Sequence, residues 1–507
     1  MSEISSIPLI SEGNPMKPNV FSSFFNFFNT IKPIIQAIKQ AGGIPYLVGG
    51  CVRDLVIGRE LKDFDIEVHK LSLEQLETIL KKFGPVMLVG KKFGVLRIAG
   101  LDADWSLPRK DSKGRKPTVA IDPAMSIGEA CRRRDVTMNA MALDLGYVVE
   151  HESELEKNVT THIIDPYGGL DDIHNKRLRA VDQTLFLEDP LRFFRVMQFI
   201  GRFEMIPDQA LNNLCASMDL KDATTNAPLA RERIYEEIKK LLLKSRRPSL
   251  GFRWLVDIKR LQELFPELYT LIGVTQATEY HPEGDVFEHT MQTLDATAQL
   301  PYYVDQPTMP AAEEKYIITL AALCHDLGKP ATTDQNLHAH GHEQAGVTPA
   351  KKLLKRLTND QSVIKAVLKL VAHHMLPANF LEQQAGAKAY KRMALKLVPD
   401  VTLRQLALVA LADKQGRNPH GQEPLIEQHH EMYKKFLQHA EEAMVAHGPE
   451  APLLLGRHLL DVVSPGPAMG KMLKEAYRIQ IEEGIRDIEV LKQKAQEYSD
   501  GMAKGKK

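Results

Sequence analysis

The first third of the chain alternates short apolar runs with helix-like stretches. Each run is three to five residues long, which is typical of strands in a small sheet. The five predicted strands lie at residues 46–48, 64–68, 85–89, 95–98 and 103–107. Strands interleaved with helices predict an α/β domain, in which a small mixed sheet is covered by helices.

Beyond residue 150 the apolar positions recur at helical spacing, which predicts helices to the end of the chain. A helix is expected at 185–203, and a long amphipathic segment opens at 230. Before the sheet, the aromatic run at 21–28 together with Ile31, Ile34, Ile35 and Ile38 predicts an amphipathic helix packed on the α/β domain. Residues 1–20 are rich in Ser, Pro, Gly and Asn, and we expect them to be disordered.

These changes of pattern divide the chain into five predicted segments. A chain of 507 residues has room for about two to four globular domains. The predicted segments are a disordered leader at 1–29, the α/β domain at 30–150, a first helical domain at 151–275, a second helical domain at 276–440 and a helical tail at 441–507.

Composition and charge narrow the class of protein only slightly. The chain has 65 basic and 65 acidic residues, so a nucleic-acid partner would need local basic patches. Its four cysteines have no metal-binding spacing, which fits a reduced, cytoplasmic setting. The aromatic run at 21–28 is too short to span a bilayer and follows no cleavable signal, so we expect no membrane contact.

The α/β domain is organised around a glycine turn and two acids. Gly49 and Gly50 follow the first predicted strand, and Asp63 and Asp65 lie around the next, where positions i and i+2 point to the same face. Two such carboxylates repel unless a cation lies between them, and paired Mg²⁺ ions roughly 3.5–4 Å apart suit attack on a phosphate. Paired glycines let backbone N–H groups approach a triphosphate. The alternative is a plain turn with solvated acids.

Two later features could extend this site. Asp104 would be a third carboxylate for the metals if its strand neighbours the strand of Asp65, although an acid on an exposed strand fits the pattern equally well. Residues 90–94 are expected to form a tight turn between strands. Residues 110–120, with four Lys or Arg, are expected to form a mobile basic loop that either is solvated or holds nucleic-acid phosphate.

A run of arginines follows the sheet directly. Arg132, Arg133 and Arg134 precede Asp135 and Asn139, and such a group is costly to bury without an anionic partner. Arginine suits bidentate contacts to phosphate, and Asp135 or Asn139 could hold ribose hydroxyls. The start of a surface helix, with Asp135 as its cap, is the alternative.

The helix expected at 185–203 carries Asp189 and Arg192 on one face, three residues apart. An intrahelical salt bridge is the ordinary explanation of such a pair. The segment 165–172, rich in Asp and Gly, is expected to form a turn before this helix.

A second group of polar residues extends from residue 289 to residue 413. Neutral imidazole and carboxylate are suitable ligands for a borderline divalent metal. A single histidine on a helix is usually structural, but a set of this size, on helix-like segments or at their ends, predicts a metal site. The candidate ligands are His289, His325, Asp326, His342, His373 or His374, and Asp413.

Together these motifs resemble the class II tRNA nucleotidyltransferase/poly(A) polymerase family, in the bacterial form with an HD domain. The resemblance extends over roughly residues 40–480. It is carried, in order, by Gly49-Gly50-x-Val52-Arg53-Asp54, Asp63-x-Asp65, Arg133-Arg134-Asp135, Asp165-Pro166-x-Gly168-Gly169, Glu188-Asp189-x-x-Arg192 and His325-Asp326. The zero net charge and the HD set favour the CCA-adding branch, because poly(A) polymerases tend to have a basic C-terminal extension and usually lack this domain.

For the α/β head, the resemblance implies template-independent addition of CCA to the tRNA 3′ end from CTP and ATP. It implies that Asp63 and Asp65 are catalytic and hold two Mg²⁺ ions, with Asp104 as a third candidate. The residues implied to bind the nucleotide are Gly49, Gly50, Arg53, Arg134, Asp135, Asn139, Asp189, Arg192 and Arg195. Asp189 would accept from the amino group of cytosine or adenine and Arg192 would donate to the ring nitrogen, whereas uracil and guanine present the opposite order.

For the helical part, the resemblance implies a neck at 151–275, joined to the head near 165–169, and an HD domain at 276–440. It implies metal-dependent phosphodiesterase or phosphatase activity with Ni²⁺, Co²⁺ or Mn²⁺, and it favours His374 over His373. The alternatives are a poly(A) polymerase of the same family, an enzyme that adds only CC or only A, and an HD phosphohydrolase whose head binds RNA. The sequence leaves the choice between monomer and homodimer open.

Overall fold

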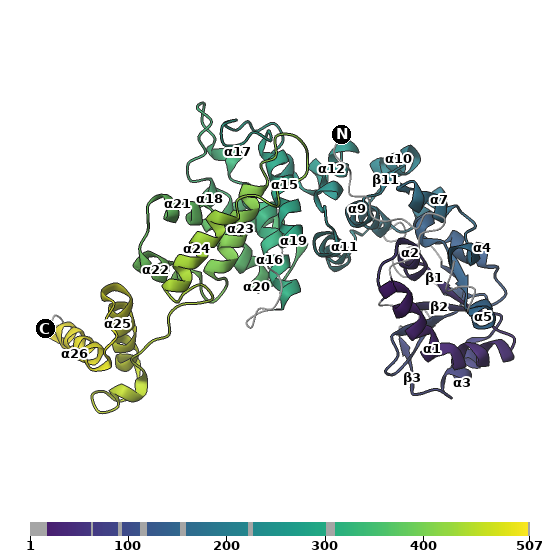
Figure 1. Ribbon diagram of the computed structural model, residues 1–507, viewed down its shortest axis with the longest axis horizontal. Helices are drawn as coiled ribbons and strands as arrows, with labels where there is room; N and C mark the ends of the chain where they lie inside the picture. The colour runs from purple at the N-terminus through teal and green to yellow at the C-terminus, as the bar shows by residue number, and fades with distance from the viewer. Residues whose placement is uncertain are drawn as a thin grey trace. The chain divides into compact units, whose positions relative to one another are not determined.

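The computed structural model describes residues 18–61, 64–89, 94–111, 119–152, 159–221, 227–300 and 310–504. The chain divides into two compact units, which Figure 1 colours by position along the chain. The first unit comprises Met1–Leu241 and Trp254–Arg260, and the second comprises Leu242–Arg253 and Leu261–Lys507. These units do not coincide with the five predicted segments, which remain predictions.

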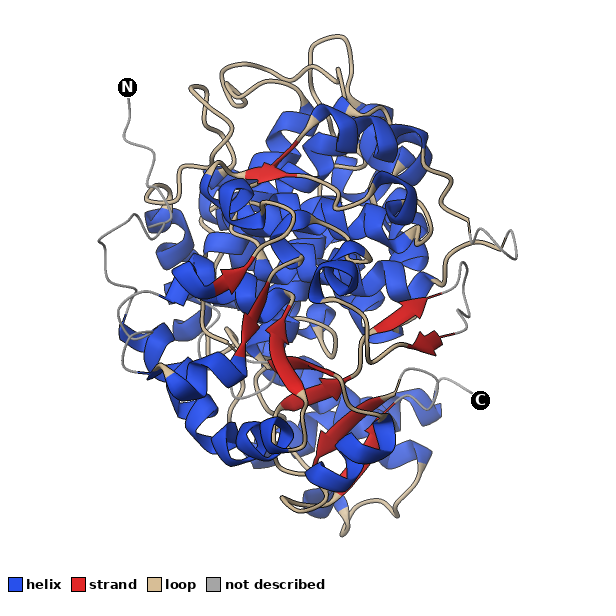
Figure 2. Ribbon diagram, turned by 90° about the vertical axis from the view of Figure 1, so that its right-hand side faces the viewer, coloured by secondary structure: helices blue, strands red, loops and turns tan. Residues whose placement is uncertain are grey.

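The first unit contains a mixed sheet of seven strands in the order β3-β4-β5-β2-β1-β8-β9. Strands β2 and β5 are parallel, and the other neighbouring pairs are antiparallel. The predicted small mixed sheet with helices is confirmed, and Figure 2 shows the strands in red among the helices. The strands are β1 (Ile44–Val48), β2 (Phe64–His69), β3 (Val86–Val89), β4 (Val95–Ile98), β5 (Ala103–Ser106), β8 (Ala142–Asp144) and β9 (Ile163–Ile164).

Helix α1 (Pro18–Gln40) packs on the head through one apolar face. Its buried side chains recur at helical spacing and are Phe24, Phe28, Ile31, Ile34, Ile35 and Ile38. Phe27 also stacks on Phe64 of β2, with ring centroids 3.4 Å apart. The predicted amphipathic helix is confirmed, but the predicted disordered leader at 1–29 is wrong for residues 18–29, because the helix begins at Pro18 and buries two phenylalanines of that segment.

A short hairpin replaces both ends of the basic loop predicted at 110–120. Strands β6 (Arg109–Asp111) and β7 (Val119–Ile121) pair antiparallel, so these ends are extended and hydrogen-bonded. Residues 112–118 lie outside the described residues. The turn predicted at 90–94 also lies largely outside them, although the two strands that it joins, β3 and β4, do pair antiparallel.

The helix predicted at 185–203 is interrupted. Helix α8 ends at Phe186 and α9 begins at Leu191, with Pro190 between them. The Asp189 carboxylate accepts a hydrogen bond of 3.1 Å from the Leu191 amide, so it caps α9 from outside the helix. The prediction that Asp189 and Arg192 share a helix face is therefore wrong, because a proline and a capping acid start a new helix between them.

The remaining elements of the first unit are helices and two short strands, β10 and β11, which pair in parallel. They are α2 (Gly50–Ile57), α3 (Leu73–Leu80), α4 (Ile127–Arg132), η1 (Thr137–Asn139), α5 (Leu145–Glu150), η2 (Val159–His162), α7 (Gly169–His174), β10 (Arg177–Leu178), α8 (Gln183–Phe186), α9 (Leu191–Phe203), β11 (Ile206–Pro207), α10 (Gln209–Ser217) and α11 (Arg231–Lys244). Helix α12 (Ser249–Asp257) contributes residues to both units.

The described part of the second unit is helical, as predicted. Helix α15 packs against α16 and α23, and α16 also packs against α20. The helices before the tail are α13 (Leu261–Leu264), α14 (Pro266–Tyr269), α15 (Val286–Gln299), α16 (Ala311–Cys324), α17 (Lys329–Thr332), α18 (His342–Ala345), α19 (Val347–Leu357), α20 (Gln361–His373), α21 (Leu376–Glu382), α22 (Ala387–Leu397), α23 (Leu403–Gln415) and α24 (His430–Glu442).

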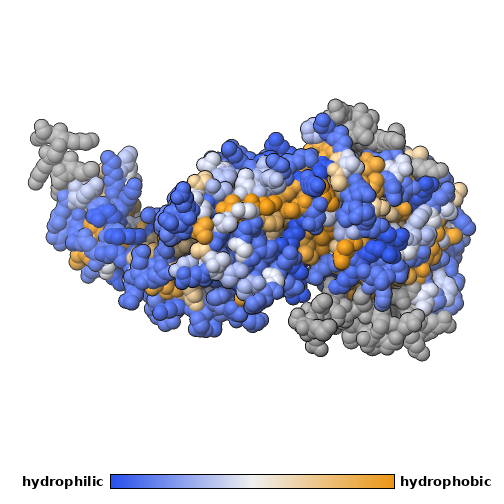
Figure 3. Space-filling model, turned by 90° about the horizontal axis from the view of Figure 1, so that it is seen from above, coloured by the Kyte–Doolittle hydropathy of each residue, from blue (hydrophilic) through white to orange (hydrophobic). Residues whose placement is uncertain are grey.

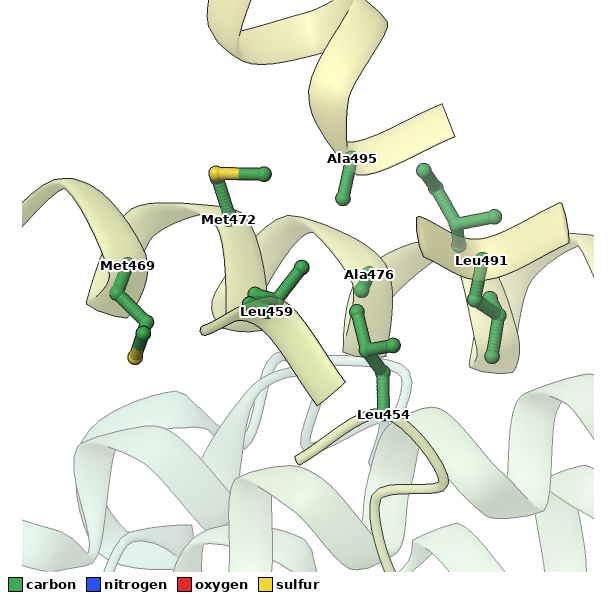
Figure 4. Close-up of a cluster of buried hydrophobic side chains, with 8 residues drawn as sticks. Leu454, Leu459, Met469, Met472, Ala476, Leu491 and Ala495 are labelled. Carbon is green, nitrogen blue, oxygen red and sulfur yellow. The ribbon is translucent and has the colours of Figure 1, made fainter. Parts of the chain in front are cut away.

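The C-terminal tail has an apolar cluster of its own. It consists of η3 (Gly456–Leu459), α25 (Pro467–Glu483) and α26 (Ile488–Lys504). Figure 4 shows Leu459, Met472 and Ala476 facing Leu491 and Ala495, and all of these side chains are buried. Because α25 and α26 are amphipathic and antiparallel neighbours, each covers the apolar face of the other.

The face of the molecule shown in Figure 3 is mainly hydrophilic, with strips of apolar residues between the polar ones. Among the described residues, no helix is long and apolar enough to cross a membrane.

Candidate functional site

In the first unit, two acids meet on neighbouring strands. Asp65 of β2 is in register with Asp104 of β5 across a parallel pair, so both side chains lie on the same face. The condition set for Asp104, that its strand neighbours the strand of Asp65, is thus confirmed. Arg97 of β4 binds the Asp104 carboxylate through two nitrogens, with one contact of 2.9 Å. Asp63 lies outside the described residues, so its predicted position beside Asp65 stays a prediction.

The glycine turn lies under two guanidinium groups. Gly49, at φ 74°, caps the N-terminus of α2, and a Cβ there would lie 2.4 Å from Nη1 of Arg134. A Cβ on Gly50 would lie 3.4 Å from Nη2 of Arg53. The Nε of Arg134 is buried without a hydrogen-bond partner among the described residues. A glycine turn with two converging cations fits an anionic group such as a phosphate.

A hydrogen-bonded chain joins four of the predicted nucleotide-binding residues. Arg53 donates to Asn139 at 2.6 Å, Asn139 donates to Asp135 at 3.0 Å, and Arg195 of α9 donates to Asp135 at 2.6 Å. Burial alone would raise the pKa of Asp135, but Arg195 and Asn139 hold this pKa at about 2. The chain therefore fixes a charged, buried bridge between the helix of the glycine turn and α9.

Glu67 is a part of this site that the sequence analysis did not identify. It is 1% exposed, lies two residues after Asp65 on β2, and binds Nη2 of Arg133 at 2.9 Å and Nε2 of His69 at 3.1 Å. Burial opposes its charge, but His69, Arg134 and Arg133 lower the pKa of Glu67 to about 2. The sequence feature that could have identified Glu67 is its i+2 spacing from Asp65, because residues at that spacing lie on one face of a strand.

Asp189 and Arg192 lie at the start of α9, but their contacts differ. The Asp189 side chain is 42% exposed, with Arg233 at 3.7 Å. Arg192 is half-buried and donates to the backbone carbonyls of Leu185 and Arg133. No ion pair joins Asp189 to Arg192 among the described contacts, so the intrahelical salt bridge considered from sequence is absent. The bond to Arg133 connects α9 to the arginine run.

In the second unit, the six predicted metal ligands converge. His289 lies on α15 and Asp413 on α23, while His325, His342 and His374 lie at the ends of α16, α18 and α20. Nε2 of His289 is 3.2 Å from Nε2 of His325, and Nε2 of His342 is 3.1 Å from Nε2 of His374. All six residues are buried.

The histidine tautomers make this cluster a site for a cation. Nδ1 of His325, His342 and His374 each lies 2.7–2.8 Å from a backbone carbonyl, so each Nδ1 carries the proton. The facing Nε2 atoms then hold lone pairs at hydrogen-bond distance from each other, with no proton between them. Buried lone pairs beside buried carboxylates are stable only around a positive charge, which fits a divalent metal.

The ligands fall into two groups that share Asp326. One carboxylate oxygen of Asp326 is 3.2 Å from Nε2 of His325, and the other is 3.3 Å from Nε2 of His342. The first group adds His289 and Asp413, which are 3.1 Å apart, and the second adds His374. The arrangement therefore has room for a metal on either side of Asp326. His373 lies outside both groups, in agreement with the preference for its neighbour.

Charged residues that the sequence analysis missed surround the ligands. Glu283 lies 2.7 Å from Nδ1 of His289 and 2.9 Å from Nδ1 of His281, and its pKa falls to about 2 because these hydrogen bonds outweigh burial. Lys329 pairs with Asp326 at 2.8 Å, and Arg417 pairs with Asp413 at 2.8 Å. The signal for Glu283 was only its position six residues before His289, within no regular element.

Similarity to solved structures supports the fold. The CCA-adding enzyme of Bacillus stearothermophilus in complex with CTP superposes with a TM-score of 0.60 at 20% identity, covering 97% of this chain and 100% of that one. The CCA-adding enzyme of Thermotoga maritima complexed with tRNA has a TM-score of 0.52 at 16% identity, covering 93% and 95%.

Sequence similarity identifies the family. Residues 45–179 match the poly A polymerase head domain, and residues 286–418 match the HD domain. The multifunctional CCA protein of Mannheimia succiniciproducens is 32% identical over 381 residues, covering 73% of this chain and 84% of the relative. The protein of the same name from Stenotrophomonas maltophilia is 33% identical over 386 residues, covering 73% and 86%. The chain therefore belongs to the family of the multifunctional CCA proteins, with a poly A polymerase head domain and an HD domain.

Proposed function

We propose that the first unit adds CCA to the 3′ end of tRNA, without a template, from CTP and ATP. The observation that carries the proposal is the position of Arg134 and Arg53 over the Gly49-Gly50 turn, in the sheet that pairs Asp65 with Asp104. Relatives named multifunctional CCA proteins, and similar structures of CCA-adding enzymes with CTP or tRNA, support it. We further propose that the protein acts on tRNA in the cytoplasm.

In this proposal the head residues hold and orient the reactants. Asp63 and Asp65, with Asp104 beside them, would hold Mg²⁺, which when bound supplies activation of the 3′-OH and stabilises the leaving pyrophosphate. Arg134 and Arg53, whose guanidinium groups lie against the glycine turn, bind the triphosphate. Asn139 and Asp135, which are held by Arg53 and Arg195, would contact the ribose hydroxyls.

Nucleotide selection falls to Asp189 and Arg192. The exposed Asp189 carboxylate accepts a hydrogen bond from the amino group of cytosine or adenine, and Arg192 donates to the adjacent ring nitrogen. Uracil and guanine present a carbonyl beside an N–H, so both contacts would fail and leave polar groups unpaired. The anchoring of Arg192 to Leu185 and Arg133 holds its guanidinium in one orientation, which supports this assignment.

One assay separates CCA addition from its alternatives. The protein is incubated with tRNA that ends before CCA and with each nucleoside triphosphate singly and together, and the product lengths are read. CCA addition predicts three added residues with CTP and ATP together, and two with CTP alone. A ladder of A residues would instead establish a poly(A) polymerase, and addition of only CC or only A would establish a partial enzyme.

We also propose that the second unit is a metal-dependent phosphohydrolase that acts on phosphodiesters or phosphomonoesters of nucleosides or tRNA ends. The convergence of unprotonated Nε2 atoms on Asp326 supports metal binding, with Ni²⁺, Co²⁺ or Mn²⁺ suited to imidazole and carboxylate ligands. When bound, such a metal would supply an activated water and polarise the phosphate. Protein loaded with each metal should hydrolyse a cyclic nucleotide or a phosphomonoester. Inactivity on both substrates would indicate that the metal has only a structural role.

A further inference from the structure

Three guanidinium groups surround one phenyl ring at the end of α9. The guanidinium carbons of Arg53, Arg59 and Arg202 lie 4.4, 4.6 and 4.9 Å from the ring centroid of Phe203. Phe203 is 3% exposed, so the ring is part of the core and holds the three cations close to one another. We call Arg53, Arg59, Arg202 and Phe203 the arginine cluster.

Among the described residues, one carboxylate, Asp54, is within ion-pair distance of the arginine cluster, whereas Asp54, Glu204 and Glu237 act on Arg59 and Arg202 only from longer range. Arg53 is paired with Asp54 at 2.8 Å, but no carboxylate lies within ion-pair distance of Arg59 or Arg202 among the described residues. Arg202 donates to Gln198 at 3.2 Å, and its Nε is buried without a hydrogen-bond partner. Burial and the neighbouring Arg53 lower the pKa of Arg202 to about 10. Cations that repel each other in a partly buried position are stable when an anion joins them.

A purely structural role explains only part of this arrangement. Arg59 follows the end of α2 and donates to the carbonyl of Arg202 at 2.7 Å, and cations are favourable at helix C-termini. That role accounts for Arg59, which braces α2 against α9. It does not account for the unpartnered Nε of Arg202, nor for a third guanidinium on the same ring.

The position of the cluster connects it with the nucleotide site. Arg192, Arg195, Phe199 and Phe203 recur at helical spacing along one face of α9. The base-selecting Arg192 is about 15 Å along the helix axis from Arg202, at 1.5 Å per residue. Arg53 belongs to both groups, because it also contacts Asn139 and lies over Gly50. The cluster thus adjoins the phosphate side of the site, at the opposite end of α9 from the base.

We propose that Arg59 and Arg202, together with Arg53, form a second phosphate-binding subsite for a substrate of the head. The inference rests on the proposed function of the first unit. Two sources supply this chemistry: the terminal phosphate of the nucleoside triphosphate, released as pyrophosphate, or a backbone phosphate near the 3′ end of the RNA. Guanidinium groups stacked on a ring keep their N–H edges available for either.

The test compares Arg59→Gln and Arg202→Gln with Lys81→Gln, which removes one positive charge from an exposed helix end in the same unit. Three quantities are measured for each: the KM for CTP, the Kd for inorganic pyrophosphate from direct binding, and the Kd for tRNA without CCA at several salt concentrations. A triphosphate source predicts rises of about tenfold in KM and in the Kd for pyrophosphate. An RNA source predicts a higher Kd and a slope of log Kd against log salt lower by about 0.7–0.9.

If all three quantities are unchanged in both variants and only the melting temperature falls, the subsite is refuted. Arg59 and Arg202 would then only stabilise the packing of α2 against α9. If a glutamine variant does not fold, Arg59→Lys and Arg202→Lys replace it, because they keep the charge but lose the planar fork. Binding of pyrophosphate and tRNA is measured without turnover. A wild-type protein that adds no CCA therefore refutes the proposed function and still leaves the subsite measurable.

Discussion

The two candidate sites neutralise their buried charges in opposite ways. In the head, the buried carboxylates Asp135 and Glu67 are paired with Arg195 and Arg133. In the second unit, four imidazole Nε2 atoms face each other and the carboxylates of Asp326 and Asp413, with Lys329 and Arg417 at the margin. The buried carboxylates of the head are therefore neutralised by arginines, whereas those of the second unit lie among imidazole lone pairs that fit a cation.

This difference fits the ligands proposed for the two sites. A nucleotide site must receive an anion, so its guanidinium groups have to be held in place before the ligand arrives. A metal site must receive a cation, so its lone pairs converge and are costly until the ion is bound. The comparison predicts that the two sites can be disabled separately and respond differently to chelators.

The largest effect is expected from substitutions of the metal-binding carboxylates. Asp65→Asn should lower CCA addition by at least about 1,000-fold, because metal catalysis supplies several kcal/mol of transition-state stabilisation. Asp326→Asn should lower phosphohydrolase activity to a similar extent and leave CCA addition unchanged. Both activities and tRNA binding are measured for each variant. Loss of both activities in either variant, or loss of tRNA binding in Asp65→Asn, would contradict two separate sites.

The next effect concerns nucleotide choice in the head. Arg192→Ala should reduce the preference for CTP over UTP by about 100-fold, because a site that hydrogen-bonds its ligand rejects a base that leaves its polar groups unpaired. This preference is measured as the ratio of the kcat/KM values for the two nucleotides. The control is Arg231→Ala, at an exposed position of α11. A variant that kept its preference would remove Arg192 from base selection.

Metal removal should change the melting temperature of the second unit but not that of the first. If the second site binds Ni²⁺ or Mn²⁺ at 100 to 1,000 times its Kd, binding contributes about 3–4 kcal/mol to stability. A chelator should then lower the melting temperature of the second unit and leave that of the first unchanged, measured by calorimetry. In Asp326→Asn the chelator should have little further effect. Equal shifts in both units would contradict the comparison.

Acid should weaken the head through Asp135. Its pKa is about 2 in the folded protein and about 3.9 when unfolded, so the unfolded state binds more protons between these values. The contribution of Asp135 to the free energy of unfolding is complete above about pH 4. It decreases as the pH falls toward 2, by about 2.5 kcal/mol at most. Asp135→Asn should flatten this part of the urea-unfolding profile, with the exposed Asp102→Asn as the control. An unchanged profile in Asp135→Asn would show that Arg195 does not stabilise its charge.

The smallest effect is expected at Glu67, as a positioning residue. Glu67→Gln keeps the shape but weakens the hold on Arg133 beside Arg134, so the KM for CTP should rise about tenfold with a smaller change in kcat. Glu67→Asp should restore part of the loss, and the exposed Glu74→Gln should change neither constant. A loss confined to melting temperature would limit Glu67 to a structural role.

Local pattern was enough to predict the elements that carry the chemistry. The strand at 95–98 is observed as predicted, and those at 46–48 and 64–68 are each observed within β1 and β2, because apolar runs of this length bounded by turns are typical of strands. The error at α9 has a local cause that was visible in the sequence: Pro190 and the capping side chain of Asp189 start a new helix. The error at α1 concerns only its boundary, because the leader was extended to residue 29 although the aromatic run at 21–28 was interpreted as part of the amphipathic helix.

The sequence by itself determined which groups can bind phosphate and metal: the glycine turn, the arginine run, and the set from His289 to Asp413. Only the tertiary structure decided which of them meet. The register of Asp65 with Asp104, the pair of Glu67 with Arg133 and the sharing of Asp326 by two ligand groups all join residues far apart in the chain or on different elements. Such contacts depend on strand pairing and helix packing, which leave no periodic signal at the residues concerned.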